Sequence, residues 1–453
     1  MAQYKVETGS YDSKISKHFE VMMLANNANG DIVTTTNPLP VSLQSSNGQK
    51  NTISFRDTST DAFGRLRVSE PLTLFDSHFR YKDNQLWSTS NTATANATFS
   101  ANEGLINLNV DTTANAEVIR ETTKVFSYQP GKSLLIFNTA VFAPPQTNLR
   151  QRFGYYGANN GMYLEQTGST VNFVERSSVT GVMTEIRVPK SDWNVDKMDG
   201  TGPSGKILDL TKAQILWMDV EWLGLGTVRI GFIIDGEFIL CHRFNHANII
   251  MTTYITTASL PLRYEIKNID VTANNSTLKQ ICSSVISEGG YELRGLQQAV
   301  GTPITAPKDL TTAGVFYPIV SIRLKSSPNR LDAIVILTAL SILGITNNAY
   351  YNWQVIASPT TSGGTWVSAG DNSAVEYNIT GTGTTGGRIL ASGFAGATNQ
   401  SAAPIDILKE ALFKFQLERD GLTGTPYELT LVAAPSTNGA DIYASMDWEE
   451  ISR

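Results

Sequence analysis

The stretch VRIGFIIDGEFILCHRF, residues 228–244, decides the fold class of this chain. Two segments rich in Ile, Val and Phe flank the dipeptide Asp235-Gly236. Asp-Gly accommodates the positive φ angles of a type I′ turn, which joins two antiparallel strands directly. The sequence therefore predicts a β-hairpin with strands at 228–234 and 237–244.

The region around this hairpin has the same character. Apolar and polar residues alternate at 106–110 and again at 262–267, as they do in half-buried strands. Residues 134–142 are apolar enough for a central strand covered on both faces, and residues 215–222 carry apolar side chains on both pleat faces. Many strands without alternating helices predict a central antiparallel β-sandwich, jelly-roll or lectin-like, in an all-β protein.

A chain of 453 residues exceeds the ~250–300 residues at which single cores stop growing. Residues 1–70 contain short apolar pieces between turn-forming segments, which predicts an extended N-terminal arm for attachment or oligomerisation. The central sandwich is expected at 71–286. Paired glycines in SEGGYELRG mark the boundary to a second, C-terminal β-sandwich at 287–453.

The C-terminal part contains six segments that fit strands, at 318–324, 351–356, 375–379, 413–417, 427–432 and 442–448. Residues 332–343, DAIVILTALSIL, fit either a strand or a buried helix, and periodicity does not decide between them. Residues 404–412 fit one short helix.

Composition narrows the functional classes. Charged residues make up 17% of the chain, below the ~25% typical of globular domains, and Asn, Thr, Ser and Gly supply the remaining polarity. A net charge of −6 and the lack of a basic stripe give no reason to expect nucleic-acid binding. No apolar stretch approaches the ~20 residues of a membrane span, and no signal peptide is evident. We expect Cys241 and Cys282 to be free thiols in a protein made in a cytoplasm.

Asp219 and Glu221 are the strongest catalytic candidates. An i, i+2 pair on one strand places two carboxyl groups on the same face, roughly 7 Å apart. Glycoside hydrolysis uses such a pair, one as acid and the other as base or nucleophile. The alternative, which we favour, makes them ordinary polar residues beside Trp217 or partners of Arg229 and Arg243. We therefore predict no catalytic residue and no enzymatic activity, with a glycosidase as the alternative.

Metal and cofactor sites are not expected. His242 and His246 have the spacing of zinc ligands in a helical HExxH motif, but they flank a strand end and residue 243 is Arg. His18 and His78 are isolated. Phosphate-binding loops, dinucleotide fingerprints and EF-hand patterns do not occur in the sequence.

Aromatic residues between 153 and 163 are candidates for binding a sugar. Tyr155, Tyr156 and Tyr163 lie among Asn and Gly residues, a combination in which rings stack on pyranoses and amides bond their hydroxyls. Aromatic side chains also fill sandwich cores, and core packing is the favoured alternative for these three.

Several long segments resemble structural proteins of tailed phages, especially T4-like and marine or cyanobacterial phages. They occur in the same order along the middle half of the chain: DAFGRLRVSEPLTLFDSHFRY (61–81), WMDVEWLGLGTVRIGFIIDGEFILCHRFNHAN (217–248), PLRYEI (261–266) and CSSVISEGGYE (282–292). TTTNPLPVSL (34–43) is similar to segments near the attachment end of phage fibre and tail proteins. Residues from 295 onward resemble no family.

The resemblance implies a virion component and no catalytic residue. We expect a subunit of a fibre or spike-type appendage, anchored through its N-terminal part and assembled as a homotrimer, as is common in phage fibres. Its partners would be other virion proteins and a host-surface glycan. A glycan-binding receptor-recognition protein, a glycan-degrading tail spike and a head decoration or neck component are the alternatives.

Overall fold

The computed structural model describes residues 41–44, 52–55, 70–92, 94–292, 294–397, 405–406 and 414–452. Contacts divide the chain into two units, Met1–Val68 and Ser69–Arg453. In the first unit, β1 (Val41–Gln44) pairs antiparallel with β2 (Thr52–Phe55). The rest of the predicted N-terminal arm, 1–70, lies almost entirely outside the described residues.

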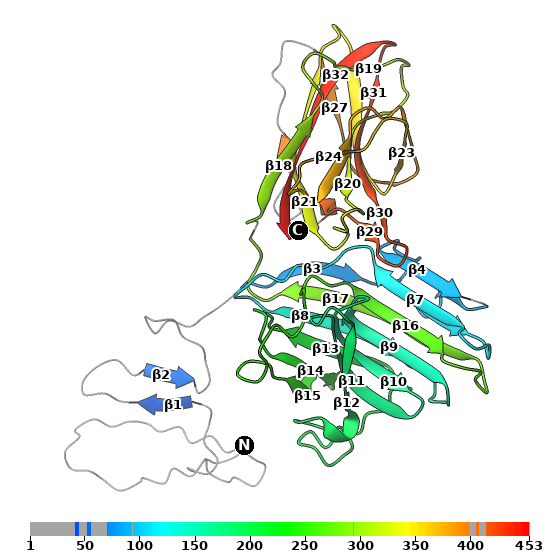
Figure 1. The fold of residues 1–453 in the computed structure, drawn as a ribbon, viewed down its shortest axis with the longest axis vertical. Helices are drawn as coiled ribbons and strands as arrows, with labels where there is room; N and C mark the ends of the chain where they lie inside the picture. Colours follow the sequence, from blue (N-terminus) through cyan, green and yellow to red (C-terminus); the bar gives the residue numbers. More distant parts are fainter. Residues whose placement is uncertain are drawn as a thin grey trace, which may run out of the picture. The chain divides into compact units, whose positions relative to one another are not determined.

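The second unit begins with a sandwich of two antiparallel sheets (Figure 1). The seven-stranded sheet has the order β12 (Thr184–Pro189), β11 (Thr170–Ser177), β10 (Gly161–Thr167), β9 (Leu149–Tyr156), β16 (Leu262–Asn268), β7 (Glu117–Thr122) and β4 (Trp87–Thr92). The eight-stranded sheet has the order β15 (Glu237–Phe244), β14 (Val228–Ile234), β13 (Gln214–Val220), β8 (Leu134–Val141), β17 (Ser276–Ser287), β6 (Leu105–Val110) and β5 (Asn96–Ser100), with β3 (Leu72–Ser77) also paired to β17.

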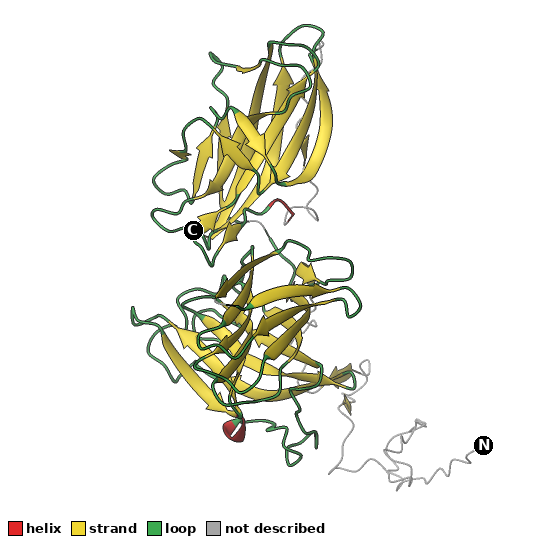
Figure 2. Cartoon of the chain, turned by 90° about the vertical axis from the view of Figure 1, so that its right-hand side faces the viewer, coloured by secondary structure: helices red, strands yellow, loops and turns green. Residues whose placement is uncertain are grey.

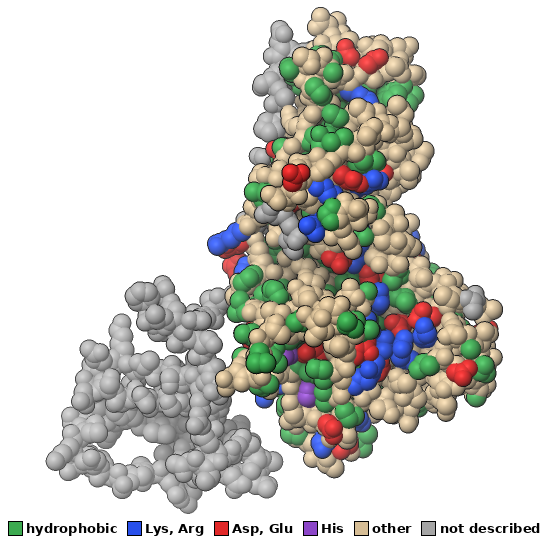
Figure 3. Space-filling model, in the orientation of Figure 1, with side chains coloured by type: hydrophobic (Ala, Val, Ile, Leu, Met, Phe, Trp, Pro, Cys, Tyr) green, Lys and Arg blue, Asp and Glu red, His purple; other side chains and the backbone are tan. Residues whose placement is uncertain are grey.

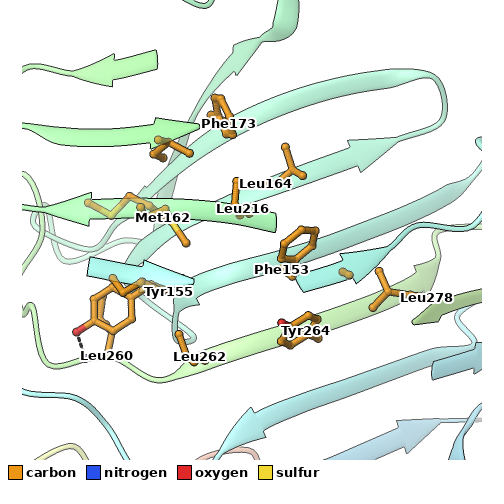
Figure 4. Packing of buried hydrophobic residues seen from close by; sticks show 14 of the residues in the cluster. Phe153, Tyr155, Met162, Leu164, Phe173, Leu216, Leu260, Leu262, Tyr264 and Leu278 are labelled. Carbon is orange, nitrogen blue, oxygen red and sulfur yellow. Dashed lines mark hydrogen bonds between the residues drawn. The ribbon is translucent and has the colours of Figure 1, made fainter. Parts of the chain in front are cut away.

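The core of this sandwich is built by alternate side chains of the two sheets, as the pleat requires. Phe153 of β9 stacks on Tyr264 of β16 with centroids 5.5 Å apart, and Leu216 and Leu278 approach from the eight-stranded sheet (Figure 4). Strands distant in sequence are neighbours here, β9 beside β16 and β8 beside β17. Such long connections between antiparallel strands are typical of Greek-key and jelly-roll sandwiches.

The predicted hairpin is confirmed. β14 pairs with β15, and the turn residues have φ angles of 55° at Asp235 and 82° at Gly236. The register shifts between Ile230 and Gly231, a β-bulge that sequence periodicity did not reveal. Strand β8 is central, as predicted, but a second sheet covers only one of its faces. Its other side chains, Phe137 among them, are half-buried.

A second sandwich follows, so the predicted all-β architecture is confirmed (Figure 2). One sheet has the order β18 (Leu296–Gly301), β32 (Ala440–Ser452), β21 (Ile334–Gly344) and β28 (Ile405–Asp406), with β19 (Lys308–Leu310) paired to β32. The six-stranded sheet has the order β24 (Val367–Ser368), β25 (Val375–Asn378), β20 (Tyr317–Leu324), β31 (Glu428–Pro435), β22 (Tyr350–Ala357) and β27 (Arg388–Gly396). Two small pairs complete it: β23 (Thr360–Ser362) with β26 (Gly383–Thr385), and β29 (Arg419–Asp420) with β30 (Thr425–Pro426).

The structure decides the ambiguous segments of this part. Residues 334–344 form strand β21, which pairs with β32. Its first four residues are buried on both faces, Val335 and Leu337 in the sandwich core and Ile334 and Ile336 against Val125, which explains the continuous apolar sequence. The strand predicted at 413–417 is wrong, because residues 414–415 form a 3₁₀ turn and Gln416 makes only an isolated bridge to Ile336. Of the helix predicted at 404–412, residues 405–406 form β28 instead, and the others lie outside the described residues.

Helices are minor in the parts of the chain that the structure describes. The 3₁₀ helix η1 (Lys190–Asp192) follows β12. Within these parts, no helix is long and apolar enough to cross a membrane.

Candidate functional site

The outer face of the seven-stranded sheet, the one turned away from the core, gathers charged residues from six strands. In β9, Phe153 and Tyr155 point into the core, so the alternate residues Arg150 and Arg152 point outward. Ion pairs join these arginines to residues of neighbouring strands. We call the resulting set the arginine–glutamate lattice; it consists of Arg150, Arg152, Arg176, Arg187, Arg263, Glu121, Glu165, Glu185 and Glu265.

Each of the three central carboxylates in the lattice is paired with at least two arginines. Glu165 accepts from Arg152 at 2.6 Å and from Arg187 at 2.8 Å. Glu265 lies 2.7 Å from a guanidinium nitrogen of Arg150 and 3.5 Å from one of Arg152. Arg152 and Glu165 are almost completely buried, whereas the Arg187 side chain is 41% exposed. Arg152 therefore links the two glutamates in the buried part of the lattice.

The third central carboxylate, Glu185, closes the lattice toward the edge strand β12. It accepts from Arg176 at 2.6 Å and is also paired with Arg187. Positive and negative side chains lie side by side on the surface over the region of β9 and β16 (Figure 3).

Two tyrosines lie within the lattice and stiffen it. The rings of Tyr156 and Tyr163 are 4.3 Å apart and fully buried. The Arg176 guanidinium lies 5.3 Å from the centre of the Tyr156 ring and 5.1 Å from that of Tyr163, within cation–π range. Tyr163 also donates a hydrogen bond to Glu185, and burial raises the pKa of its phenol.

The lattice favours the ionised form of Glu185 and of Glu265. Burial alone would raise the pKa of Glu185, but hydrogen bonds from Tyr163 and Arg176 and the charge of Arg152 lower it to about 2. Burial likewise opposes ionisation of Glu265, yet the charges of Arg152 and Arg150 lower its pKa. A general acid must retain its proton near the working pH. The lowered pKa values of Glu185 and Glu265 are the opposite of what this role needs.

The lattice reaches into the second sandwich through Glu121. Arg419 binds this carboxylate at 2.9 Å, and both side chains are buried. The same guanidinium donates to the Thr122 carbonyl oxygen at 2.8 Å. A buried charge pair of this kind tolerates little displacement, because losing either partner leaves a buried charge without compensation.

Asp219 and Glu221 are not placed as two carboxylates on one strand face. Asp219 lies directly opposite Arg229 of β14 and is paired with it. Burial raises the pKa of Asp219, the charge of Arg229 opposes this, and the charge of Glu221 adds to it. Strand β13 ends at Val220, so Glu221 is an exposed loop residue. The predicted partnership with Arg229 is present, whereas a catalytic role for the pair stays untested.

The predicted sugar-contact tyrosines are all buried. Tyr155 faces the core, where its hydroxyl oxygen lies 2.8 Å from the Phe126 carbonyl oxygen and 2.5 Å from that of Ala258. Tyr156 and Tyr163 lie in the lattice described above. A glycan could stack on Tyr156 or Tyr163 only after arginine side chains had moved, and on Tyr155 only after the core had opened. Their burial agrees with the packing role that was the favoured alternative.

The histidines have structural surroundings. His246 stacks on Tyr254 with centroids 3.9 Å apart, and its two ring nitrogens lie 2.7 Å from a Glu175 carboxylate oxygen and 2.5 Å from the Gly226 carbonyl oxygen. His242 is buried, and burial lowers its pKa to about 4. Among the described residues, no group of three or more His, Cys, Asp or Glu side chains could hold a metal ion. Cys241 and Cys282 are free, as predicted.

Part of the outer face of the eight-stranded sheet carries an apolar surface in place of a charged lattice. Phe238 is 55% exposed, and its ring lies 5.4 Å from Trp217 and 6.0 Å from Phe137. A shallow cavity of about 250 Å³ opens next to Phe137 and is also lined by polar residues of β3, β8 and β17, including Asp76 and Ser284. The apolar pattern on both faces of residues 215–222 was the sequence signal for this surface.

The charged lattice, by contrast, was not foreseen. Its signal in the sequence is weak: charges at alternate positions, as in Arg150/Arg152, Glu185/Arg187 and Arg263/Glu265. That pattern normally indicates a solvent-exposed face.

The sequence matches no protein-family model, and no curated protein is similar to it. Solved structures with a similar fold include a β-1,3-1,4-glucanase (lichenase) derived from a mouse hindgut metagenome, with 15% identity over 47% of this chain and 97% of that chain and a TM-score of 0.30. The carbohydrate recognition domain of Emp47p has 10% identity over 51% of this chain and 100% of its own, with a TM-score of 0.31. The CBM2 module of the evolved Dit of Lactobacillus casei BL23 phage J-1 has 7% identity over 50% and 100%, with a TM-score of 0.32.

Proposed function

We propose that this chain is a non-enzymatic structural protein of a tailed-phage virion and forms part of a fibre or spike-type appendage. The observation that carries the non-enzymatic part is the state of the lattice, whose buried carboxylates are neutralised by arginine. Glu185 in particular has a pKa of about 2. The virion part of the proposal rests on the resemblance of the segments between residues 61 and 292 to phage structural proteins.

The architecture suits such a role. Two β-sandwiches joined by the buried pair Arg419–Glu121 resist independent movement, which a load-transmitting appendage requires. Anchoring is assigned to residues 1–70, and the proposed state is a homotrimer in contact with other virion proteins. A host-surface glycan is the proposed external partner.

The position of the chain in purified particles tests the proposal. Gold-labelled antibodies against residues 69–453 are expected to mark a tail appendage in electron micrographs. Labelling of the head or neck would support the decoration or collar alternative instead. Particles that carry neither label nor peptides of this chain by mass spectrometry would refute a virion role. Light scattering of the full chain at micromolar concentration should give the mass of a trimer, and a monomer would contradict that state.

A glycan-degrading spike is kept as a second candidate because of one observation, the raised pKa of Asp219 beside Glu221. A raised pKa is what a general acid needs. We expect the purified chain to release no reducing ends from host-surface polysaccharide. If it does release them, and Glu221→Gln abolishes the release while leaving thermal unfolding unchanged, the enzyme is the correct assignment.

A further inference from the structure

Two large aromatic side chains are exposed next to each other on the second sandwich. Tyr350 of β22 is 61% exposed and Phe394 of β27 is 81% exposed. In the strand register, Tyr350 lies opposite Gly396 and Asn352 lies opposite Phe394, so the two aromatic residues are diagonal neighbours on one face. Diagonal side chains on paired strands lie roughly 7–8 Å apart, within reach of a single ligand.

Uncharged polar side chains lie next to the two rings. Asn352 follows Tyr350 on the same face of β22 and lies opposite Phe394, and Gln354 and Ser392 form the next cross-strand pair on that face. Ser392 is exposed and Gln354 is half-buried, so their polar groups lie where a sugar hydroxyl can reach them.

Core packing and hydrogen bonds beneath β22 and β27 fix the position of this surface. Tyr351 and Trp353 point into the core, and the Tyr351 hydroxyl donates to the Asp441 carbonyl oxygen at 2.7 Å. β27 packs so closely that a Cβ atom on Gly393 would lie 2.5 Å from the Trp353 ring. The backbone N–H of Tyr350 donates to the Ser436 hydroxyl at 2.9 Å. A ligand would therefore meet a surface that is already ordered, which lowers the entropic cost of binding.

We propose that Tyr350, Asn352, Gln354, Ser392 and Phe394 form a binding platform for a neutral glycan. Aromatic faces pack against the C–H groups on one face of a pyranose, while the amides and the hydroxyl bond its polar edge. The platform itself carries no charged side chain, so nothing in it would compensate the carboxylate or sulfate of an anionic glycan. In the proposed appendage, the platform would attach the particle to its host. Only this biological role depends on the proposed function; the sugar binding does not.

The test is binding of the full chain to an array of neutral and acidic oligosaccharides built from two to six hexose or N-acetylhexosamine units. We expect binding to at least one neutral oligosaccharide, and Phe394→Ala and Tyr350→Ala should each weaken it about five- to tenfold. The matched control is Phe238→Ala, which removes an exposed phenylalanine from the first sandwich and should leave binding unchanged. Because Phe394 and Tyr350 are exposed, both variants should unfold at the wild-type temperature.

The platform would be overturned if the chain bound no neutral oligosaccharide, whether or not it bound acidic ones, or if Phe394→Ala and Phe238→Ala lost binding equally. Loss of contact with another virion protein in Phe394→Ala, without any sugar binding, would assign the surface to a protein partner and also overturn it. Failure of the virion proposal can be distinguished from failure of the platform. If the chain were absent from particles, the virion proposal would fail, but the sugar-binding measurement would be unaffected.

Discussion

Replacing Arg152 by Met should destabilise the first sandwich strongly. Its guanidinium is buried and binds Glu165 at 2.6 Å and Glu265 at 3.5 Å. Removing one partner of a buried ion pair typically costs ~3–5 kcal/mol. Each glutamate keeps a second arginine, Arg187 or Arg150, so the cost should fall at the lower end, about 3 kcal/mol.

The matched control removes the other arginine from the same carboxylate. Arg187 also binds Glu165, at 2.8 Å, but its side chain is 41% exposed. Water can solvate what Arg187→Met leaves behind, so the loss should be at most ~1 kcal/mol. Both variants replace an arginine that pairs with Glu165 by methionine, and they differ in how deeply that arginine is buried.

Urea unfolding followed by tryptophan fluorescence measures both losses in free energy of unfolding. A loss of about 3 kcal/mol corresponds to a drop in Tm of about 10 °C for a domain of this size. Replacing Arg152 and Glu165 together by Met should recover part of the loss, since no unpaired charge then remains at that position. If Arg152→Met and Arg187→Met each cost ~1 kcal/mol or less, the lattice is solvated and the reasoning is refuted.

Three further predictions concern pH and the contact between the sandwiches. Hydrogen bonds to Glu175 and Gly226 raise the pKa of His246 despite its burial. The stabilisation that protonated His246 provides is therefore fully present below the pKa of the unfolded state and is lost as pH rises through the pKa of the folded state. Glu175→Gln should flatten the pH dependence of the free energy of unfolding in urea between pH 6 and 9. The pKa of Glu185 is lowered to about 2, so the stabilisation from its ionised form is present above pH ~4.5 and is lost as pH falls toward 2. Glu185→Gln should be less stable than wild type at pH 6, and it should lose less free energy of unfolding than wild type between pH 4.5 and 2. Arg419→Met should split calorimetric unfolding into two separated transitions, because it removes the buried pair with Glu121, and one unchanged transition would contradict this.

Local patterns made the first sandwich largely predictable from sequence. Asp235-Gly236 defined a hairpin because the turn type depends on two adjacent residues, and alternation at 262–267 defined a strand of the seven-stranded sheet. Residues 332–343 could not be resolved, because a continuous apolar run satisfies a buried strand and a buried helix equally well. Only the pairing of β21 with β32, about a hundred residues away in sequence, decides it.

The candidate site was less predictable, for a physical reason. Alternation places Arg263 and Glu265 on the face opposite Tyr264, which usually means the solvent side. Their burial depends on partners from strands that are distant in sequence, such as Arg150 of β9 and Glu121 of β7. A single strand carries no information about these partners, so the charges could be foreseen but not their mutual neutralisation.

The lattice also helps to fix the strand register. A slip of one residue would turn every side chain of a strand to the other face. In β9, such a slip would bring Arg152 into the core in place of Phe153 and leave Glu165 short of one partner, so it would combine a buried unpaired charge with a lost aromatic contact. An apolar outer face would penalise the same slip far less, because apolar side chains from either face can fill a core. Charges on one face and aromatic residues on the other therefore fix the strand register of this sheet more sharply than hydrophobic patterning alone.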